Sequence, residues 1–343
     1  MKKFVLLLLV IAIIGSTFAD CSAASKPKKL PVLKVAIMPF LLSLPVKYMV
    51  DRGWDKENGF KIETILFSTG APMNEALGAG LWDVATIGTA AVTTISVYNA
   101  KLIAETSDAA GGIELFARPD SPIAKVKGFN PTFPTLMGNP ETVRGKTILM
   151  PIGTIVQLMA LKWEEKIGVK DKEVNSVNME YATAFQAFNS GQGDLVALNP
   201  PLSFMAHEKG WVSVCNLNDL KIPQYDNVLA SSNAYEKKKN LLVKFVRLMY
   251  RANAELKKNP ALEAKELSAW YKQNGQNVDE KLVKAEVASR PLLTAEDARK
   301  KPLGDAMKTT AEFMASIGKL QTDKLPIFDK NIVNDVLKAA LRK

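Results

Sequence analysis

Threonine, glycine and amide side chains follow apolar segments at four places in this 343-residue chain, and these places could bind an acidic ligand. Each segment reads as a strand that runs into a helix, and the first turn of a helix leaves backbone N–H groups unpaired and carries partial positive charge. A carboxylate or sulfonate oxygen is well placed there. Neighbouring hydroxyl groups could donate further hydrogen bonds or cap their own helices. The residues concerned are Thr69, Gly70, Ala71, Thr89, Ala90, Thr154, Gln157 and Asn199.

Three further residues stand at similar junctions. Phe40 and Leu41 follow the first predicted strand and would give the site an apolar wall, although either could belong to the core instead. Asp108 is the acid at these junctions. It could accept a hydrogen bond from an amino or hydroxyl group of a ligand, or it could cap the turn that follows it.

The sequence offers little for catalysis or for metal binding. His207 is the single histidine, and Cys21 and Cys215 are the two cysteines. These residues make neither a metal-ligand pattern nor a nucleophile with a base and an orienting acid. The sequence therefore predicts a binding protein without a cofactor or a metal, and not an enzyme.

A short phrase occurs twice, at residues 76–85 and 187–196, and its glycine and aspartate recur at a constant offset of 111 positions. Each copy reads as a helix stopped by glycine, a tight turn and a short apolar strand. The repeat predicts two similar α/β units. In open α/β sheets ligands collect where loops leave the carboxyl ends of strands, so we expect a ligand cleft between the two lobes.

The N-terminus predicts export. Lys2 and Lys3 precede the apolar run 4–14, which is short for a membrane span and is followed by small residues, so 1–24 reads as a signal peptide. Cleavage after Ala19 or Ala24 would fit. A lipid anchor at Cys21 is an alternative, and a retained membrane anchor is a third. The protein is therefore expected to be periplasmic or otherwise extracytoplasmic.

Composition indicates an ordinary globular protein of about two domains, with 47% hydrophobic residues. The formal net charge is +10, and much of the excess lies in the short runs 237–239, 257–258 and 299–301. Such runs fit a solvated face, or attraction to anionic lipid or an acidic partner. No run is interleaved with aromatic residues, which argues against nucleic-acid binding.

Turn signals near residues 118–122 and 222–226 predict two crossings between the lobes. The first lobe would comprise 31–117 plus 228–343, and the second 118–227. A proline-rich insertion at 128–142 could be a lid, or a surface loop packed on its own lobe. Helical patterns cover 239–258, 261–274, 279–288, 303–317 and 331–341, with an extended stretch near 325–328.

The order of the segments 69–77, 83–88, 144–154 and 184–199 resembles the periplasmic solute-binding proteins of the aliphatic-sulfonate, taurine and nitrate transporter group. The resemblance covers nearly the whole chain after the signal. It implies a type II periplasmic-binding-protein fold, with two α/β lobes joined by two hinge strands, that closes over a small anionic ligand. It also implies a monomer that delivers this ligand to an ABC permease with its ATPase subunits.

Two alternatives to transport stay open. The same fold could serve as the ligand-binding partner of a membrane sensor. A related branch makes the thiamine pyrimidine with its own histidine and a cysteine-rich motif, and this chain has neither the corresponding histidine nor that motif. Several relatives carry an aspartate where this chain has Asn199, and the loss of that charge argues against a cationic amine as ligand.

Overall fold

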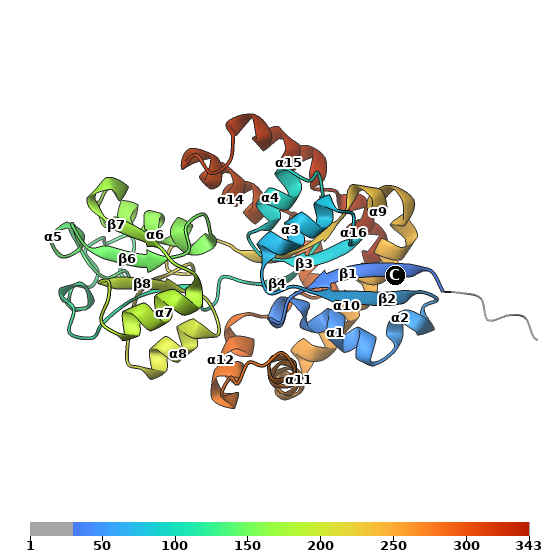
Figure 1. The fold of residues 1–343 in the computed structure, drawn as a ribbon, viewed down its shortest axis with the longest axis horizontal. Helices are drawn as coiled ribbons and strands as arrows, with labels where there is room; N and C mark the ends of the chain where they lie inside the picture. Colours follow the sequence, from blue (N-terminus) through green and yellow to red (C-terminus); the bar gives the residue numbers. More distant parts are fainter. Residues whose placement is uncertain (1–29, 343) are drawn as a thin grey trace, which may run out of the picture.

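The computed structural model describes residues 30–342, which form two α/β units joined side by side (Figure 1). The first unit contains a five-stranded sheet in the order β2-β1-β3-β10-β4. Its first three strands run parallel, and β10 lies antiparallel between β3 and β4. The strands are β1 (Val32–Ile37), β2 (Lys61–Leu66), β3 (Val84–Ile87), β4 (Lys101–Asp108) and β10 (Tyr225–Ala230).

The second unit repeats this plan with the sheet order β7-β6-β8-β5-β9. Its β6 pairs in parallel with β7 and β8, and β5 lies antiparallel between β8 and β9. The strands are β5 (Glu114–Ala117), β6 (Thr147–Met150), β7 (Asn175–Asn178), β8 (Leu195–Leu198) and β9 (Val212–Asn216). The antiparallel strand of each sheet is the one that follows a crossing from the other unit.

Because of these directions, the carboxyl ends of the parallel strands in one sheet face the carboxyl ends of the parallel strands in the other. Residues 109–113 lead from the end of β4 to the start of β5, and residues 217–224 lead from the end of β9 to the start of β10. Both crossings therefore connect the same edge of the first sheet to the same edge of the second. Figure 1 shows the arrows of β1 and β6 pointing toward each other. We call these two edges the facing edges.

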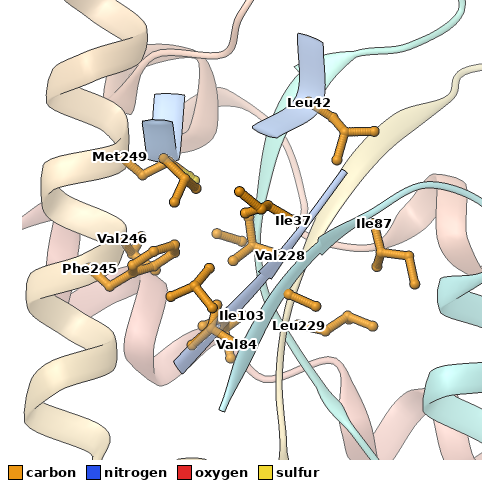
Figure 2. Close-up of a cluster of buried hydrophobic side chains, with 14 of the residues drawn as sticks. Ile37, Leu42, Val84, Ile87, Ile103, Val228, Leu229, Phe245, Val246 and Met249 are labelled. Carbon is orange, nitrogen blue, oxygen red and sulfur yellow. The ribbon is translucent and has the colours of Figure 1, made fainter. Parts of the chain in front are cut away.

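Helices cover both faces of the first sheet (Figure 1). Helix α10 packs on one face because Leu242, Phe245, Val246 and Met249 recur at helical spacing and are all fully buried. Figure 2 shows three of them pointing toward strand residues such as Val228. The helices are α1 (Leu44–Asp51), α2 (Trp54–Glu57), α3 (Gly70–Gly78), α4 (Ala91–Ser96), α9 (Ser232–Lys237), α10 (Lys239–Lys258), α11 (Pro260–Gln273), α12 (Glu280–Ser289), α13 (Ala295–Lys300), α14 (Asp305–Ser316), α15 (Leu325–Asn331) and α16 (Asn334–Leu341).

The second sheet is also covered on both faces. One hydrophobic cluster includes Val156, Met159 and Trp163 of α6, and a second includes Phe185 of α7 and Ala206 of α8. The helices of this unit are α5 (Pro140–Val143), α6 (Ile155–Lys166), α7 (Tyr181–Asn189) and α8 (Leu202–Glu208). No helix of residues 30–342 is long and apolar enough to cross a membrane.

The structure corrects three expectations from the sequence. Strand β5, which the expected boundary at 117 left in the first lobe, pairs in the second sheet, and β10 begins in the first sheet at Tyr225. Residues 325–331, in part expected to be extended, form α15. Strands β7 and β9 were not predicted. The signal peptide and Cys21 lie outside the described residues.

The insertion 128–142 packs against its own unit. The Met137 N–H donates to the Val214 carbonyl (3.0 Å), and the Trp163 indole Nε1 donates to the Met137 carbonyl (2.9 Å). The Asn130 amide donates to the Lys166 carbonyl (2.7 Å). Figure 1 places α5, at the end of the insertion, on the side of the second unit away from the first. These contacts are those of a surface loop on its own lobe.

Candidate functional site

The starts of α3 and α4 meet on the facing edge of the first sheet. A Cβ on Gly70 would lie 2.4 Å from the Cβ of Ala90, so only glycine allows the two helix starts to approach this closely. Thr69 is the exposed residue before α3, and its side chain makes no capping hydrogen bond. Ala71 is exposed, and Thr89 is half-buried next to Ala90. Two helix N-termini thus converge here, with a threonine hydroxyl beside each.

The start of α6 lies on the opposite facing edge, and its polar side chains bind their own loop. The Thr154 hydroxyl donates to the Pro151 carbonyl (2.8 Å), and Oε1 of Gln157 accepts from the Gly153 N–H (2.7 Å). The single proton of the Thr154 hydroxyl is therefore committed, contrary to the expectation that it would reach a ligand. The backbone N–H groups of the first turn remain as the donors at this helix.

Two residues that the sequence did not single out join this loop. Oδ1 of Asn178 accepts from the Ile152 N–H (2.9 Å), and the Tyr181 hydroxyl is hydrogen-bonded to Thr154. Burial raises the pKa of Tyr181 to about 12, so its hydroxyl stays protonated. Both residues flank the junction from β7 to α7. The same strand-to-helix rule would have found them, but the polar sequence of β7 hid the strand.

The remaining predicted site residues differ in burial and in their hydrogen-bond partners. Leu41 is fully buried and belongs to the first core, whereas Phe40 is partly buried at its border. Oδ1 of Asp108 accepts from the Ala110 N–H (2.9 Å), so this aspartate caps its turn. Asn199 is half-buried before a cis peptide bond between Pro200 and Pro201.

A buried charged network lies at the facing edge of the first sheet, beside the crossings. Oδ2 of Asp226 accepts from the Ser107 hydroxyl (2.6 Å) and from Nη2 of Arg290 (2.9 Å). Nη1 of Arg290 also bonds Oε1 of Glu286 (3.1 Å), whose other oxygen accepts from the Tyr271 hydroxyl (2.7 Å). Burial raises the pKa of Asp226 and that of Glu286, and the Arg290 guanidinium opposes the rise in both. The sequence separates these residues too widely to suggest the network.

The first crossing packs tightly against both units. A Cβ on Gly111 would lie 1.9 Å from the Ser289 carbonyl oxygen at the end of α12, and a Cβ on Gly112 would lie 2.7 Å from Cγ of Pro200. The Asp108 N–H donates to the Pro291 carbonyl (3.0 Å). The C-terminal helices of the first unit are therefore anchored to the connection between the units.

Within the described part of the chain, neither the pocket among the C-terminal helices nor a metal centre coincides with the predicted site residues. A pocket of about 610 Å³ lies elsewhere in the first unit, among residues of α13, α14, α15 and α16 and the loops beside them, and contains none of the predicted site residues. Among residues 30–342, no group of three or more histidine, cysteine or acidic side chains could hold a metal ion.

Comparisons with known proteins agree with this architecture. Residues 137–263 match the family model described as NMT1/THI5 like. A candidate ABC transporter periplasmic binding protein from Brachyspira hyodysenteriae is 40% identical over 345 residues, which cover 99% of this chain and 100% of that protein.

Two solved structures show the fold. The periplasmic aliphatic sulphonate binding protein SsuA from Escherichia coli superposes with a TM-score of 0.69 at 16% identity, covering 88% of this chain and 92% of that one. The periplasmic nitrate-binding protein NrtA from Synechocystis PCC 6803 gives a TM-score of 0.68 at 14% identity, covering 91% and 88%. The expected periplasmic-binding-protein fold is thus confirmed.

Proposed function

The chain belongs to the periplasmic binding proteins of ABC transporters, and we propose that it captures a small organic anion between its facing edges and delivers it to a permease. The observation that carries this proposal is the opposition of helix starts: those of α3 and α4 on one edge, and that of α6 on the other. The first-turn N–H groups of α3 and α6 and the partial positive charge of these helix starts suit one acidic group between the lobes. In α4 the N–H groups of Ala91 and Val92 already donate to the Gly88 and Thr89 carbonyls. The permease acts with its ATPase subunits.

The ligand is a sulfonate or carboxylate with an apolar body. Thr69 and Thr89 supply hydroxyl donors near the acidic group, and Phe40 supplies apolar contact for the carbon skeleton. A bare inorganic ion would need more charged partners to offset its desolvation than these helix starts offer. The names of the structural relatives, sulphonate and nitrate binding proteins, support an anion.

In this proposal each lobe is built around one of the two sheets. The first comprises 30–108 plus 225–342, the second comprises 114–216, and the two crossings between them are the hinges. We further propose that the protein acts as a monomer outside the cytoplasm, after removal of the segment 1–24 or with a lipid anchor at Cys21.

Within residues 30–342, the single histidine is paired with a carboxylate and the single cysteine is buried, which supports binding without catalysis. Nε2 of His207 lies 3.0 Å from Oε1 of Glu114, and the hydrogen bond to this carboxylate raises the pKa of His207. Burial raises the pKa of Cys215 well above its ordinary value, so this thiol is a poor nucleophile.

A thermal-shift and calorimetric screen of the exported protein tests the proposal. The panel contains alkanesulfonates, short carboxylates, nitrate and alkylamines. An anion at a hundred times its Kd should stabilise the protein by about 2.7 kcal/mol. Thr69→Val should weaken binding by about 1 kcal/mol, because it removes a donor, whereas Thr64→Val on β2 should not change it. Binding of amines alone, or of nothing in the panel, contradicts the proposal.

A further inference from the structure

We propose that Asp226 is a specificity-determining residue: its free oxygen accepts a hydrogen bond from an amino or hydroxyl group of the ligand. The inference rests on the proposed function and refines the ligand class. The ligand would then carry an acidic group at one end and an N–H or O–H donor at the other.

The position of Asp226 supports this role. It is the second residue of β10 and so lies at the facing edge of the first sheet. A Cβ on Gly88 would lie 3.8 Å from Oδ1 of Asp226, and Gly88 directly follows β3 at the same edge. Because Gly88 has no side chain, nothing from this residue covers the carboxylate. Thr89, a predicted ligand contact, is the next residue along the chain.

The hydrogen bonds of Asp226 leave one oxygen open. Both protein donors, the Ser107 hydroxyl and the Arg290 guanidinium, bind Oδ2, and within the described residues Oδ1 has no hydrogen-bond partner. The fully buried unpaired polar atoms of residues 30–342 include Oδ1 of Asp55 but not Oδ1 of Asp226, so the latter keeps some access to solvent. The carboxylate is thus held rigidly by one oxygen and presents the other.

The charges around Asp226 favour a donor from the ligand. Asp226, Glu286 and Arg290 are 2%, 1% and 8% exposed, and together they carry one more negative than positive charge when ionised. Arg290 is shared between the two carboxylates. Lys301 forms its ion pair with Glu105 (2.6 Å). A buried carboxylate with an unused oxygen is stabilised by a further donor, most strongly by a cationic one.

The Asn227 amide, which neighbours Asp226 on β10, is already engaged. The Asn227 amide donates to the Tyr225 carbonyl (3.1 Å) and, more weakly, to the Gly88 carbonyl (3.5 Å). The Asn227 amide therefore lies near the same edge but makes no hydrogen bond to Oδ1 of Asp226. We therefore assign the donor to Oδ1 of Asp226 to a ligand group that enters beside Gly88.

Matched ligands of equal size test the inference on the exported protein. The first series is 1-propanesulfonate, taurine and isethionate, which end in methyl, ammonium and hydroxyl groups. The second series is butyrate, β-alanine and 3-hydroxypropionate. In the series that binds, we expect the ammonium or hydroxyl compound to bind at least tenfold more tightly than the methyl compound, as measured by calorimetry.

Three variants separate recognition from structure. Asp226→Asn should abolish the tenfold preference. Gly88→Ala adds a methyl group at an ordinary contact distance, so it should reduce the preference with little change in Tm. Glu286→Gln removes a carboxylate of the same network and should lower Tm while it keeps the preference.

The failures are distinguishable. If the wild-type protein binds the methyl compound as tightly as the other two, or if Asp226→Asn keeps the preference, the role of Asp226 is wrong and the anion-binding function stands. If no acid of either series binds, the proposed function fails and the inference fails with it.

Discussion

Asp83 and Asp194, the aspartates of the repeated phrase, make the same contact in their two sheets. Oδ2 of Asp83 accepts from the Lys34 N–H (2.9 Å), and Oδ2 of Asp194 accepts from the Thr147 N–H (2.9 Å). In return, the Asp83 N–H donates to the Lys34 carbonyl, and the Asp194 N–H donates to the Thr147 carbonyl (2.9 Å in both). The repeat thus encodes a clamp between the helix-to-strand turn and the neighbouring strand.

The two clamps should differ in strength. The Asp83 side chain is 10% exposed and also binds Nζ of Lys238 (2.7 Å), whereas that of Asp194 is 38% exposed with Lys146 at 3.3 Å. We expect Asp83→Ala to lower the free energy of unfolding by about 2–3 kcal/mol and Asp194→Ala by about 1 kcal/mol, measured by urea unfolding. Asp120→Ala, at an exposed loop position, serves as control. Equal losses for the two clamps would contradict this ranking.

Glu164 should make stability fall as the pH rises. Its side chain is buried on α6, neither carboxyl oxygen has a partner within the described residues, and burial raises its pKa to about 8. The folded protein therefore keeps a proton that the unfolded chain releases near pH 4.5. The stability linked to this group is full below pH 4.5 and is lost as the pH rises toward 8.

Glu164→Gln removes this titration. Relative to the variant, the wild-type protein should lose about 2–4 kcal/mol of unfolding free energy between pH 5 and pH 8, as measured by denaturant unfolding at each pH. Glu165→Gln is the control, because the hydrogen bonds from Lys162 and Lys166 lower the pKa of Glu165, so this side chain is largely ionised in both the folded and the unfolded state between pH 5 and pH 8. Parallel pH profiles for wild type and Glu164→Gln would rule the idea out.

Gly111→Ala should separate the first crossing from α12. The added methyl group would overlap the Ser289 carbonyl, a backbone atom that cannot rotate away. We expect a loss of at least about 1–3 kcal/mol in unfolding free energy, seen as a lower Tm. Gly88→Ala, whose nearest contact is 3.8 Å, should leave Tm nearly unchanged. An unaltered Tm in Gly111→Ala would show that this contact is loose.

The insertion should matter for stability and not for ligand binding. Leu136 is 1% exposed, whereas Phe129 is 51% exposed. Leu136→Ala should cost about 2–5 kcal/mol of unfolding free energy, and Phe129→Ala should cost little. Neither should change the Kd for the anion that the screen identifies. A weaker Kd in the folded Phe129→Ala variant would support a lid instead.

The sequence alone was sufficient for features that depend on local spacing. The helix predicted at 239–258 coincides with α10, because its apolar residues recur at helical spacing. The repeated phrase predicted two similar units for the same reason. The helix starts with Thr69, Thr89 and Thr154 also follow from local strand-to-helix patterns, and their locations are as expected.

Only the tertiary structure decided which segments meet. Periodicity does not identify the partner of a strand, so the sequence alone places β5 in the wrong lobe. It also gives no signal for the polar strand β7 or for the contact that Tyr181 makes beside it. Likewise, only the structure shows that Leu41 is buried in the core and that the Thr154 hydroxyl donates to the Pro151 carbonyl. The contact of Asp226 with Arg290 joins residues 64 positions apart on a strand and at the end of a helix. Such contacts arise from packing of the whole chain, because the local sequence specifies an element but not what lies against it.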